Sequence, residues 1–365
     1  MNKIKLFDLS RQYKSLRVVL ERKVSRVLAS GQYIMGQNVK TFEKNVSKYL
    51  SVKNSVTCNS GTDALILALR CLDIGHGDEV ITTPFTYFST IEAILLVGAK
   101  PIFIDIDSTT FNIDCSQIER KITKKTKAIL GVHIFGHPYD AEKVKKICKK
   151  YKIKMIEDCA QSFGASIGKK QTGTFGDIGC FSFFPTKNLG CAGDGGMLVT
   201  NNNRLAKKAR MLRNHGGIQR NEHNLIGYNS RLDEIQAVVL IEKLKLVDKL
   251  NNSRIRIAKE YSKSIVNKKI ITPSYPNEVK HIFHQFTLIV DNRTRFTNYL
   301  TKNDIPFGIY YPKPAYMQPA VKKIIRNSPR LRVTESVCKK CVSIPIYPEL
   351  SKKECDLIIN TINDY

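Results

Sequence analysis

Residues 55–72 read SVTCNSGTDALILALRCL, which is a short apolar run, a turn of small polar residues and a longer apolar segment. Residues 55–60 have the composition of a strand, and residues 62–72 have the apolar spacing of a helix. A strand that leads directly into a helix is the repeating unit of α/β proteins. This stretch therefore predicts an α/β fold.

The same alternation continues along the chain. A second helical pattern covers residues 89–98, and further strand-like runs lie at 79–83, 101–106, 128–134, 154–158, 181–184 and 197–200. Short apolar strands separated by helices or turns are typical of parallel sheets that are buried on both faces. We therefore predict a large domain with a mostly parallel, seven-stranded sheet covered by helices.

A change of pattern after residue 230 indicates a second, smaller domain. The segment that follows has sustained helical periodicity and predicts one long helix or two in series. Prolines then become frequent, and FTLIV (286–290) reads as a strand. We predict a large domain over residues 1–245 and a smaller C-terminal α/β domain over residues 246–365.

Composition indicates a globular protein of the cytoplasm. The 365 residues are 42% hydrophobic and 25% charged, which is ordinary for a folded chain with a large core. The N-terminal residues are too polar for a signal peptide, and the longest apolar run, 93–98, is too short to span a bilayer. We expect no membrane association, and we expect the ten cysteines to remain reduced.

Histidine and cysteine spacing predicts no metal site. Cys338 and Cys341 form a single CxxC without a second pair of ligands nearby. The histidines of HIFGH (133–137) and HIFH (281–284) lack the HExxH pattern of a helical zinc site. Ordinary thiols and imidazoles explain these residues.

The formal net charge of +27 raises the alternative of a basic nucleic-acid-binding or regulatory protein without catalysis. However, the lysines are spread over the whole chain, and no basic cluster is interleaved with stacking aromatic residues. A general lysine-rich bias explains the charge better, and we expect no nucleic-acid partner. A positive potential also favours small anionic substrates.

Several residues with chemical potential follow the predicted strands. Gly61 and Thr62 lie between a strand and a helix, where backbone N–H groups can bind phosphate, although neighbouring Ser60 also suits a simple helix cap. Asp158 ends another strand and suits either a cationic ring nitrogen or a turn cap. Tyr87 follows a third strand and suits either stacking on a planar ligand or core packing.

Lys187 lies 29 residues beyond Asp158, between FSFFP and a glycine-rich stretch. Burying a lysine is costly unless it is paired or neutral. A phosphate cradle, a stacking aromatic ring, a carboxylate and then a lysine, each after its own strand, is the order expected of a pyridoxal phosphate (PLP) site. The lysine forms a Schiff base with the cofactor aldehyde, and the carboxylate keeps the ring nitrogen protonated.

Five segments resemble the DegT-type nucleotide-sugar aminotransferases, which are PLP enzymes of fold type I. They are NSGTDAL (59–65), TPFTY (83–87), EDCAQSFGA (157–165), SFFPTKNLGCAGDGG (182–196) and GYNSRLDEIQA (227–237). The similarity runs from about Phe7 to the C-terminus. Lys187 stands where the dehydratases of this family carry histidine, so the resemblance implies a transaminase.

The resemblance also implies roles around the cofactor. Lys187 is the catalytic lysine, Asp158 pairs with the ring nitrogen, and Tyr87 stacks on the ring. Further cofactor contacts are Gly61, Thr62 and Ser182 to the phosphate, Gln161 to the ring hydroxyl, and Asn229, which reaches the phosphate from the neighbouring subunit of a homodimer.

For the substrate, the resemblance implies glutamate as amino donor and a keto-sugar nucleotide as acceptor, giving an amino sugar nucleotide for glycan or polysaccharide biosynthesis. Tyr33 and Arg231 lie in stretches that face the sugar. Tyr310 and Tyr311 belong to FGIYYPKPAYMQPAV (307–321), which resembles the substrate loop, with Tyr310 where histidine is common. Packing under the small domain is the alternative role of these tyrosines. The loop favours a 3-keto over a 4-keto sugar and leaves the nucleotide open. An inactive PLP-binding scaffold is a further alternative.

Overall fold

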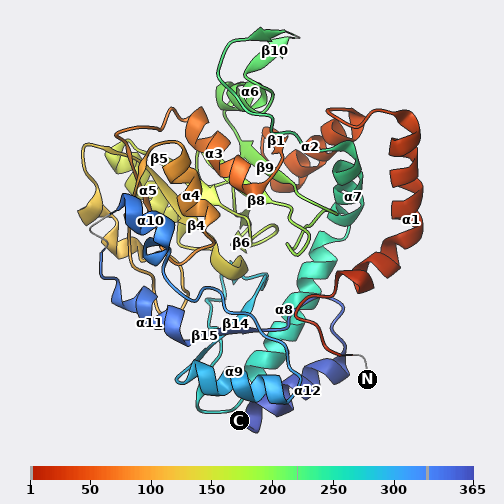
Figure 1. The fold of residues 1–365 in the computed structure, drawn as a ribbon, viewed down its shortest axis with the longest axis vertical. Coiled ribbons are helices and arrows are strands. Elements are labelled where there is room, and N and C mark those ends of the chain that lie inside the picture. Colours follow the sequence, from red (N-terminus) through yellow and green to blue (C-terminus); the bar gives the residue numbers. More distant parts are fainter. Residues whose placement is uncertain (1–2, 220, 326–328) are drawn as a thin grey trace.

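A seven-stranded sheet forms the centre of the large domain in the computed structural model, which describes residues 3–219, 221–325 and 329–365 (Figure 1). Its strands are β1 (Asn54–Cys58), β2 (Glu79–Thr82), β3 (Lys100–Phe103), β4 (Thr126–Val132), β5 (Lys154–Asp158), β8 (Ile178–Ser182) and β9 (Gly196–Thr200). Their spatial order is β1-β9-β8-β5-β4-β2-β3. Only β9 is antiparallel to its neighbours. The predicted mostly parallel, seven-stranded sheet of a fold type I enzyme is confirmed.

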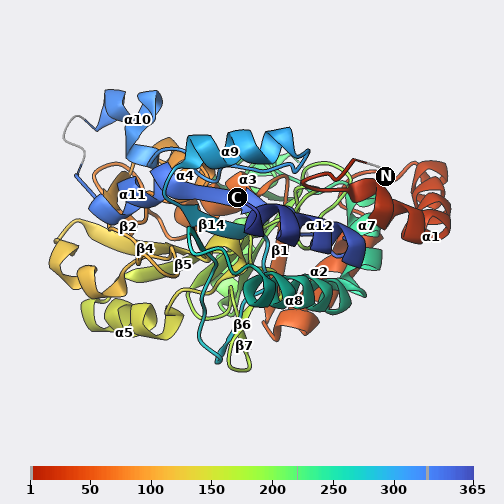
Figure 2. The same cartoon turned by 90° about the horizontal axis from the view of Figure 1, so that it is seen from below.

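Helices cover both faces of this sheet, because its strands carry apolar side chains on both sides. One face packs against α3 (Gly61–Cys71), α4 (Ser89–Leu96) and α6 (Asn203–Leu212). The other packs against α2 (Gln37–Leu50), α5 (Ala141–Tyr151) and α7 (Glu234–Leu244). Alternation within β4 shows the principle: Leu130 points toward α3, and Ile129 points toward α5. Figure 2 shows α4 and α5 on opposite sides of β4 and β5.

The N-terminal helix α1 (Leu9–Ser30) lies at the outer edge of the molecule (Figure 1). It packs on α7 through Leu16 and Leu20, which contact Val239. Most of its other side chains are exposed or half-buried. The strand and helix patterns above do not predict α1 or α2.

The C-terminal part has its own core. The helical segment after residue 230 forms two helices in series, α7 and α8 (Val247–Ser264). A three-stranded antiparallel sheet of β12 (Ile270–Ile271), β14 (Phe286–Val290) and β15 (Cys341–Ile344) packs with α8, α9 (Arg293–Lys302) and α12 (Lys352–Asn363). The predicted strand at 286–290 is thus confirmed. The predicted boundary between residues 245 and 246 falls in the α7–α8 junction and stays a prediction.

Short elements complete the chain. They are the hairpin of β10 (Gly217–Gln219) and β11 (Glu222–His223), which projects at the top of Figure 1; the small sheet of β6 (Ser166–Ile167), β7 (Lys170–Gln171) and β13 (Val279–Lys280); the helices α10 (Pro319–Ile324) and α11 (Arg332–Lys340); and the 3-10 turns η1 (Cys115–Gln117), η2 (Glu119–Lys121), η3 (Ile134–Gly136) and η4 (Ala315–Met317). Within the described ranges, no helix is long and apolar enough to cross a bilayer.

Candidate active site

A cavity of about 790 Å³ lies at the carboxyl ends of the parallel strands. This volume is within the range of small-molecule sites. Nine of the residues predicted from the sequence line it: Gly61, Thr62, Tyr87, Asp158, Gln161, Ser182, Lys187, Tyr310 and Tyr311. The first seven follow or end strands of the large sheet, whereas the last two come from the C-terminal part of the chain.

The topology explains why distant residues meet here. Parallel strands place their carboxyl ends at the same edge of a sheet, so whatever follows each strand converges. In the observed register, Asp158 is paired with Val132 on one side and with Cys180 on the other. The segment after β8 therefore begins beside Asp158, and this segment carries Lys187.

A cradle of small groups forms one end of the cavity. Ser60 caps α3 by accepting a hydrogen bond from the Asp63 N–H at 3.1 Å, so the capping role considered for Ser60 is confirmed. The N–H groups of Gly61 and Thr62 make no hydrogen bond within the described residues. A Cβ on Gly61 would lie 2.6 Å from the Ser182 Cβ, which leaves glycine as the residue that fits. Two free N–H groups at a helix N-terminus suit a phosphate group.

Asp158 is a buried carboxylate held in a fixed orientation. Its Oδ1 accepts a hydrogen bond from the Ala160 N–H at 3.1 Å, and its Oδ2 accepts one from the Thr90 hydroxyl at 2.8 Å. Burial raises the pKa of Asp158, and the two hydrogen bonds and the charge of Lys187 oppose this rise. A buried carboxylate of this kind favours a cationic partner in the cavity.

Gln161 connects the sheet to the C-terminal part of the chain. Its Oε1 accepts a hydrogen bond from the Phe135 N–H at 2.7 Å, so its Nε2 donates to the Tyr311 hydroxyl at 3.0 Å. The Tyr311 ring lies 6.3 Å from that of Tyr87. Tyr87 is 61% exposed, so it is not the packed core residue that the sequence left as an alternative.

Lys187 is held by the turn after β8. Its N–H donates to the Phe184 carbonyl at 2.9 Å, and a Cβ on Gly190 would lie 2.4 Å from the Pro185 carbonyl oxygen. A glycine is therefore needed at position 190, because the chain folds back closely on itself there. Burial lowers the pKa of Lys187 to about 8, and the nearby Asp158 carboxylate partly opposes this shift. The amine is thus much closer to neutrality at physiological pH than an ordinary lysine.

These residues fit PLP on the geometry of this chain alone. The cavity combines free N–H groups for a phosphate, a buried carboxylate for a protonated ring nitrogen, and an amine for an aldehyde. All of these groups lie on the wall of the same cavity.

Tyr33, Asn229 and Arg231 do not line the cavity of their own chain. Tyr33 and Asn229 are exposed, and Arg231 donates to the Asn214 side chain at 3.1 Å. Main-chain contacts link the segments that carry them, since Ile34 pairs with Asp233 and Asn229 pairs with Asn214. The three residues therefore occupy one connected surface outside the cavity.

Among the cavity-lining residues without a counterpart in the sequence predictions, two carry polar side chains with defined partners. Thr90 lies within α4 and holds Asp158, and His284 precedes β14 and comes from the C-terminal part. A threonine inside a helix and a histidine within an apolar motif carry no local sequence signal. Tyr316, in the predicted substrate loop, is instead fully buried, and its hydroxyl donates to Glu335 at 2.9 Å.

His133, Glu157 and Cys159 form a buried cluster whose donor atoms lie within 4.8 Å of one another. The Glu157 carboxylate is already saturated by four donors: His133 Nε2 and the N–H groups of Gly173, Phe175 and Gly176, at 2.7–3.0 Å. His133 Nδ1 accepts from the Tyr139 N–H at 3.2 Å. The hydrogen bonds that occupy His133 and Glu157 assign this cluster a structural role.

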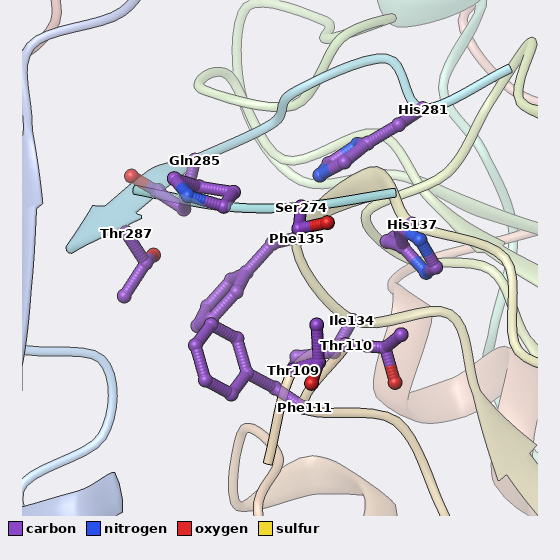
Figure 3. A pocket seen from close by; sticks show the side chains of 11 residues that line it. Thr109, Thr110, Phe111, Ile134, Phe135, His137, Ser274, His281, Gln285 and Thr287 are labelled. Atoms are coloured by element: carbon purple, nitrogen blue, oxygen red, sulfur yellow. The ribbon is translucent and has the colours of Figure 1, made fainter. Parts of the chain in front are cut away.

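A second, much smaller cavity of about 10 Å³ lies next to the candidate site (Figure 3). Figure 3 shows His137 and His281 on one side of it, and Gln285 and Thr287 on the other. Gln285 lines both cavities. The small cavity has room for about one water molecule, so it excludes a cofactor or sugar.

Comparisons with known proteins agree with this geometry. The chain is 40% identical over 361 residues to UDP-N-acetyl-3-dehydro-alpha-D-glucosamine 3-aminotransferase of Acidithiobacillus ferrooxidans, covering 98% of this chain and 97% of that protein. It is 38% identical over 365 residues to a pleiotropic regulatory protein of Geobacillus stearothermophilus, covering 99% and 98%. The crystal structure of NtdA from Bacillus subtilis with bound cofactor PMP superimposes with a TM-score of 0.93 at 30% identity, covering 99% of this chain and 85% of that chain.

A model of the DegT/DnrJ/EryC1/StrS aminotransferase family matches residues 16–363. The match spans the large sheet, all nine predicted residues of the cavity wall and the C-terminal helices and strands. The resemblance found in the sequence motifs is confirmed, and the chain belongs to the DegT/DnrJ/EryC1/StrS aminotransferase family.

Proposed function

We propose that this aminotransferase moves the amino group of glutamate to the C3 ketone of a nucleotide-linked sugar, with PLP as its cofactor. The product is an amino sugar nucleotide, a precursor for glycan biosynthesis. One observation carries the proposal: Lys187 and the buried Asp158 lie on the wall of one cavity whose end offers two free helix N–H groups.

The preference for a 3-keto sugar rests on the relatives. The protein from A. ferrooxidans carries a 3-dehydro sugar in its name and matches nearly the whole of this chain. The predicted substrate loop, with Tyr310 and Tyr311 on the cavity wall, supports the same preference. A 4-keto sugar is the alternative, and the identity of the nucleotide stays open.

Each residue has a distinct task in the proposed reaction. Bound PLP supplies an electron-accepting ring that stabilises negative charge on the carbon next to the amino group. Asp158 holds a proton on the ring nitrogen, and the N–H groups of Gly61 and Thr62 bind the phosphate with Ser182. Lys187, with a pKa of about 8, takes a proton from Cα of the amino donor and can return it, because its neutral and charged forms are both accessible near pH 8.

We further propose a homodimer with shared sites. Tyr33, Asn229 and Arg231 lie outside the cavity of their own chain, so they can contribute to a site only across an interface. Apolar Ile34 and Tyr228, 43% and 37% exposed, lie beside these residues in sequence. Exposed apolar side chains that cluster in this way favour contact with another protein surface. A cytoplasmic location is also part of this proposal.

The test is spectroscopic and covalent. Glutamate should change the absorption of the PLP-loaded protein, and a 3-keto nucleotide sugar should restore it more efficiently than its 4-keto isomer. Borohydride reduction followed by peptide mapping should place the cofactor on Lys187. A cofactor that no amino donor alters, or a label on another lysine, would refute the proposed function; faster restoration by 4-keto sugars would refute only the C3 assignment.

A further inference from the structure

Ser230 is a buried serine that contacts both sides of the cradle formed by Gly61 and Thr62, although it does not line the cavity itself. It belongs to the motif at residues 227–237, and only 1% of the residue is exposed. Its N–H donates to the Arg213 carbonyl at 2.9 Å, which fixes the backbone that carries the hydroxyl. The position of this hydroxyl is therefore set by both its backbone and its packing.

The Ser230 hydroxyl joins the two residues that flank the cradle region in sequence. Its Oγ accepts a hydrogen bond from the Asn59 N–H at 3.2 Å. Its O–H donates to Oδ2 of Asp63 at 2.6 Å. The direction of both bonds is fixed, because a backbone N–H can only donate and an ionised carboxylate can only accept. A side chain that is distant in sequence thus holds a carboxylate in the first turn of α3.

This carboxylate lies where it could compete with a phosphate group. Asp63 is the third residue of α3, and Gly61 and Thr62 are the first two. Free N–H groups and the helix dipole attract negative charge to this end of a helix, and a carboxylate in the first turn is such a charge. The two N–H groups nevertheless make no hydrogen bond within the described residues, whereas Asp63 Oδ2 is bonded to Ser230.

We propose that Ser230 is a positioning residue of the phosphate site. Its hydroxyl holds the Asp63 carboxylate away from the N–H groups of Gly61 and Thr62, which keeps these groups free for the cofactor phosphate. The inference rests on the proposed function, because it takes the two N–H groups as phosphate donors. Without the hydroxyl, the carboxylate turns toward the same N–H groups and opposes the bound phosphate.

Binding of PLP and of pyridoxal, which lacks the phosphate, tests this proposal. Ser230→Ala removes the donor that holds Asp63, so its apoenzyme should bind PLP about tenfold more weakly in a fluorescence titration, which is the size of effect that one charge has at a helix N-terminus. Its affinity for pyridoxal should be unchanged, because pyridoxal does not use the cradle. An unchanged affinity for PLP, or an equal loss for both compounds, would overturn the proposal.

Asp63→Asn tests whether the carboxylate causes the loss. Asparagine can still accept from the Ser230 hydroxyl but carries no charge, so this variant should bind PLP at least as tightly as the unaltered protein. Added to Ser230→Ala, it should restore most of the lost affinity, whereas two independent structural effects would add. If Ser230→Ala does not fold, the single variant Asp63→Asn still decides: a loss of PLP affinity of about tenfold or more would contradict the inference.

Ser343→Ala is the matched control. Ser343 is as buried as Ser230, and its hydroxyl lies 2.8 Å from that of Thr287, but it belongs to β15 and does not line the large cavity. This variant should leave both affinities unchanged, and a tenfold loss for PLP alone would count against the role of Ser230. The borohydride test on the unaltered protein is separate: a label on Lys187 with unchanged PLP affinity in Ser230→Ala would refute this inference alone.

Discussion

Replacing Asp158 with asparagine should separate the catalytic role of this residue from its structural one. The substitution preserves shape and removes only the charge. Asparagine Oδ1 can still accept from the Ala160 N–H, and its Nδ2 can donate to the Thr90 hydroxyl. Thr90 can accept because Thr86 lies 2.7 Å away and can take the Thr90 proton. The hydrogen bonds around residue 158 therefore re-form, and we expect the fold to survive.

The expected loss of activity follows from the electrostatics of a buried site. Two opposite unit charges in contact stabilise each other by about 4 kcal/mol at an effective dielectric constant of about 20. Losing this stabilisation of the protonated ring corresponds to a fall of about 10³-fold in rate. The Asp158 carboxylate also raises the pKa of Lys187, so this pKa should fall below about 8 in the variant.

The stability of the Asp158→Asn apoenzyme should not fall along with its activity. Burial raises the pKa of Asp158 above 3.8, so the folded apoenzyme binds this proton more tightly than the unfolded chain does. The contribution of Asp158 to the stability of the unaltered apoenzyme therefore declines as pH rises from about 3.8 through the folded pKa. Asp158→Asn removes this decline, so the variant apoenzyme should be at least as stable as the original at pH 7.

The assay combines the rate of the glutamate half-reaction with urea unfolding of the apoenzyme at pH 5 and pH 7. Asp140→Asn is the control, because Asp140 caps α5 by accepting from the Lys143 N–H, and asparagine caps equally well. Activity of Asp158→Asn within tenfold of the original, or an apoenzyme clearly less stable at pH 7, would refute this reasoning.

Three further predictions concern the cradle, the core and the pH profile. Gly61→Ala should weaken PLP binding at least tenfold in a fluorescence titration, because the added Cβ meets Ser182. Gly75→Ala is the control and should leave the affinity unchanged, because its Cβ would come no closer than 3.4 Å to other atoms. Equal affinities of the two variants for PLP would contradict the assignment of Gly61 to the phosphate site. Glu157→Gln should lower the free energy of unfolding by about 2–6 kcal/mol, because an amide can accept from only part of the four-donor set. The exposed Glu119→Gln should cost less than about 1 kcal/mol, and a similar small loss at Glu157 would count against a structural role. Attachment of PLP to the apoenzyme should be about 50-fold slower at pH 6 than at pH 8, because the neutral fraction of Lys187 falls with its pKa of about 8; a flat rate between these pH values would contradict that pKa.

The large sheet was predictable because each strand is buried on both faces and reads as an apolar run. The bounds of several strands differ by a few residues from their predictions, and β8 is an example: residues 181–184 were expected, and β8 covers Ile178–Ser182. Gly179 explains the shift, because a Cβ there would lie 2.3 Å from the Gly173 carbonyl oxygen. A strand residue without a side chain has no hydrophobic signal, so the start of β8 is not visible in the pattern.

The N-terminal helix α1 was not predictable in the same way. Of its residues, only Leu16, Leu20 and Val27 are buried, so its apolar stripe is narrow. A helix whose surroundings are mostly solvent carries little periodic signal, and its helical state depends on packing against α7.

Some residues of the candidate site could be predicted from the sequence, and others could not. Gly61, Asp158 and Lys187 could be predicted because each follows or ends a strand whose end is recognisable in the sequence. Thr90 and His284 could not, because their places at the cavity depend on contacts with residues far away in the chain: Thr90 with Asp158, and His284 with Asn188.

By itself, the sequence determined the strand and helix alternation, the chemical types of the key residues and the order in which they occur, because these depend on local composition and spacing. Only the tertiary structure decided which side chains share one cavity, that Tyr33, Asn229 and Arg231 lie outside it, and that Lys187 has a pKa of about 8. The physical reason is that burial, hydrogen-bond direction and electrostatic surroundings are set by neighbours that are distant in sequence and meet only when the chain folds.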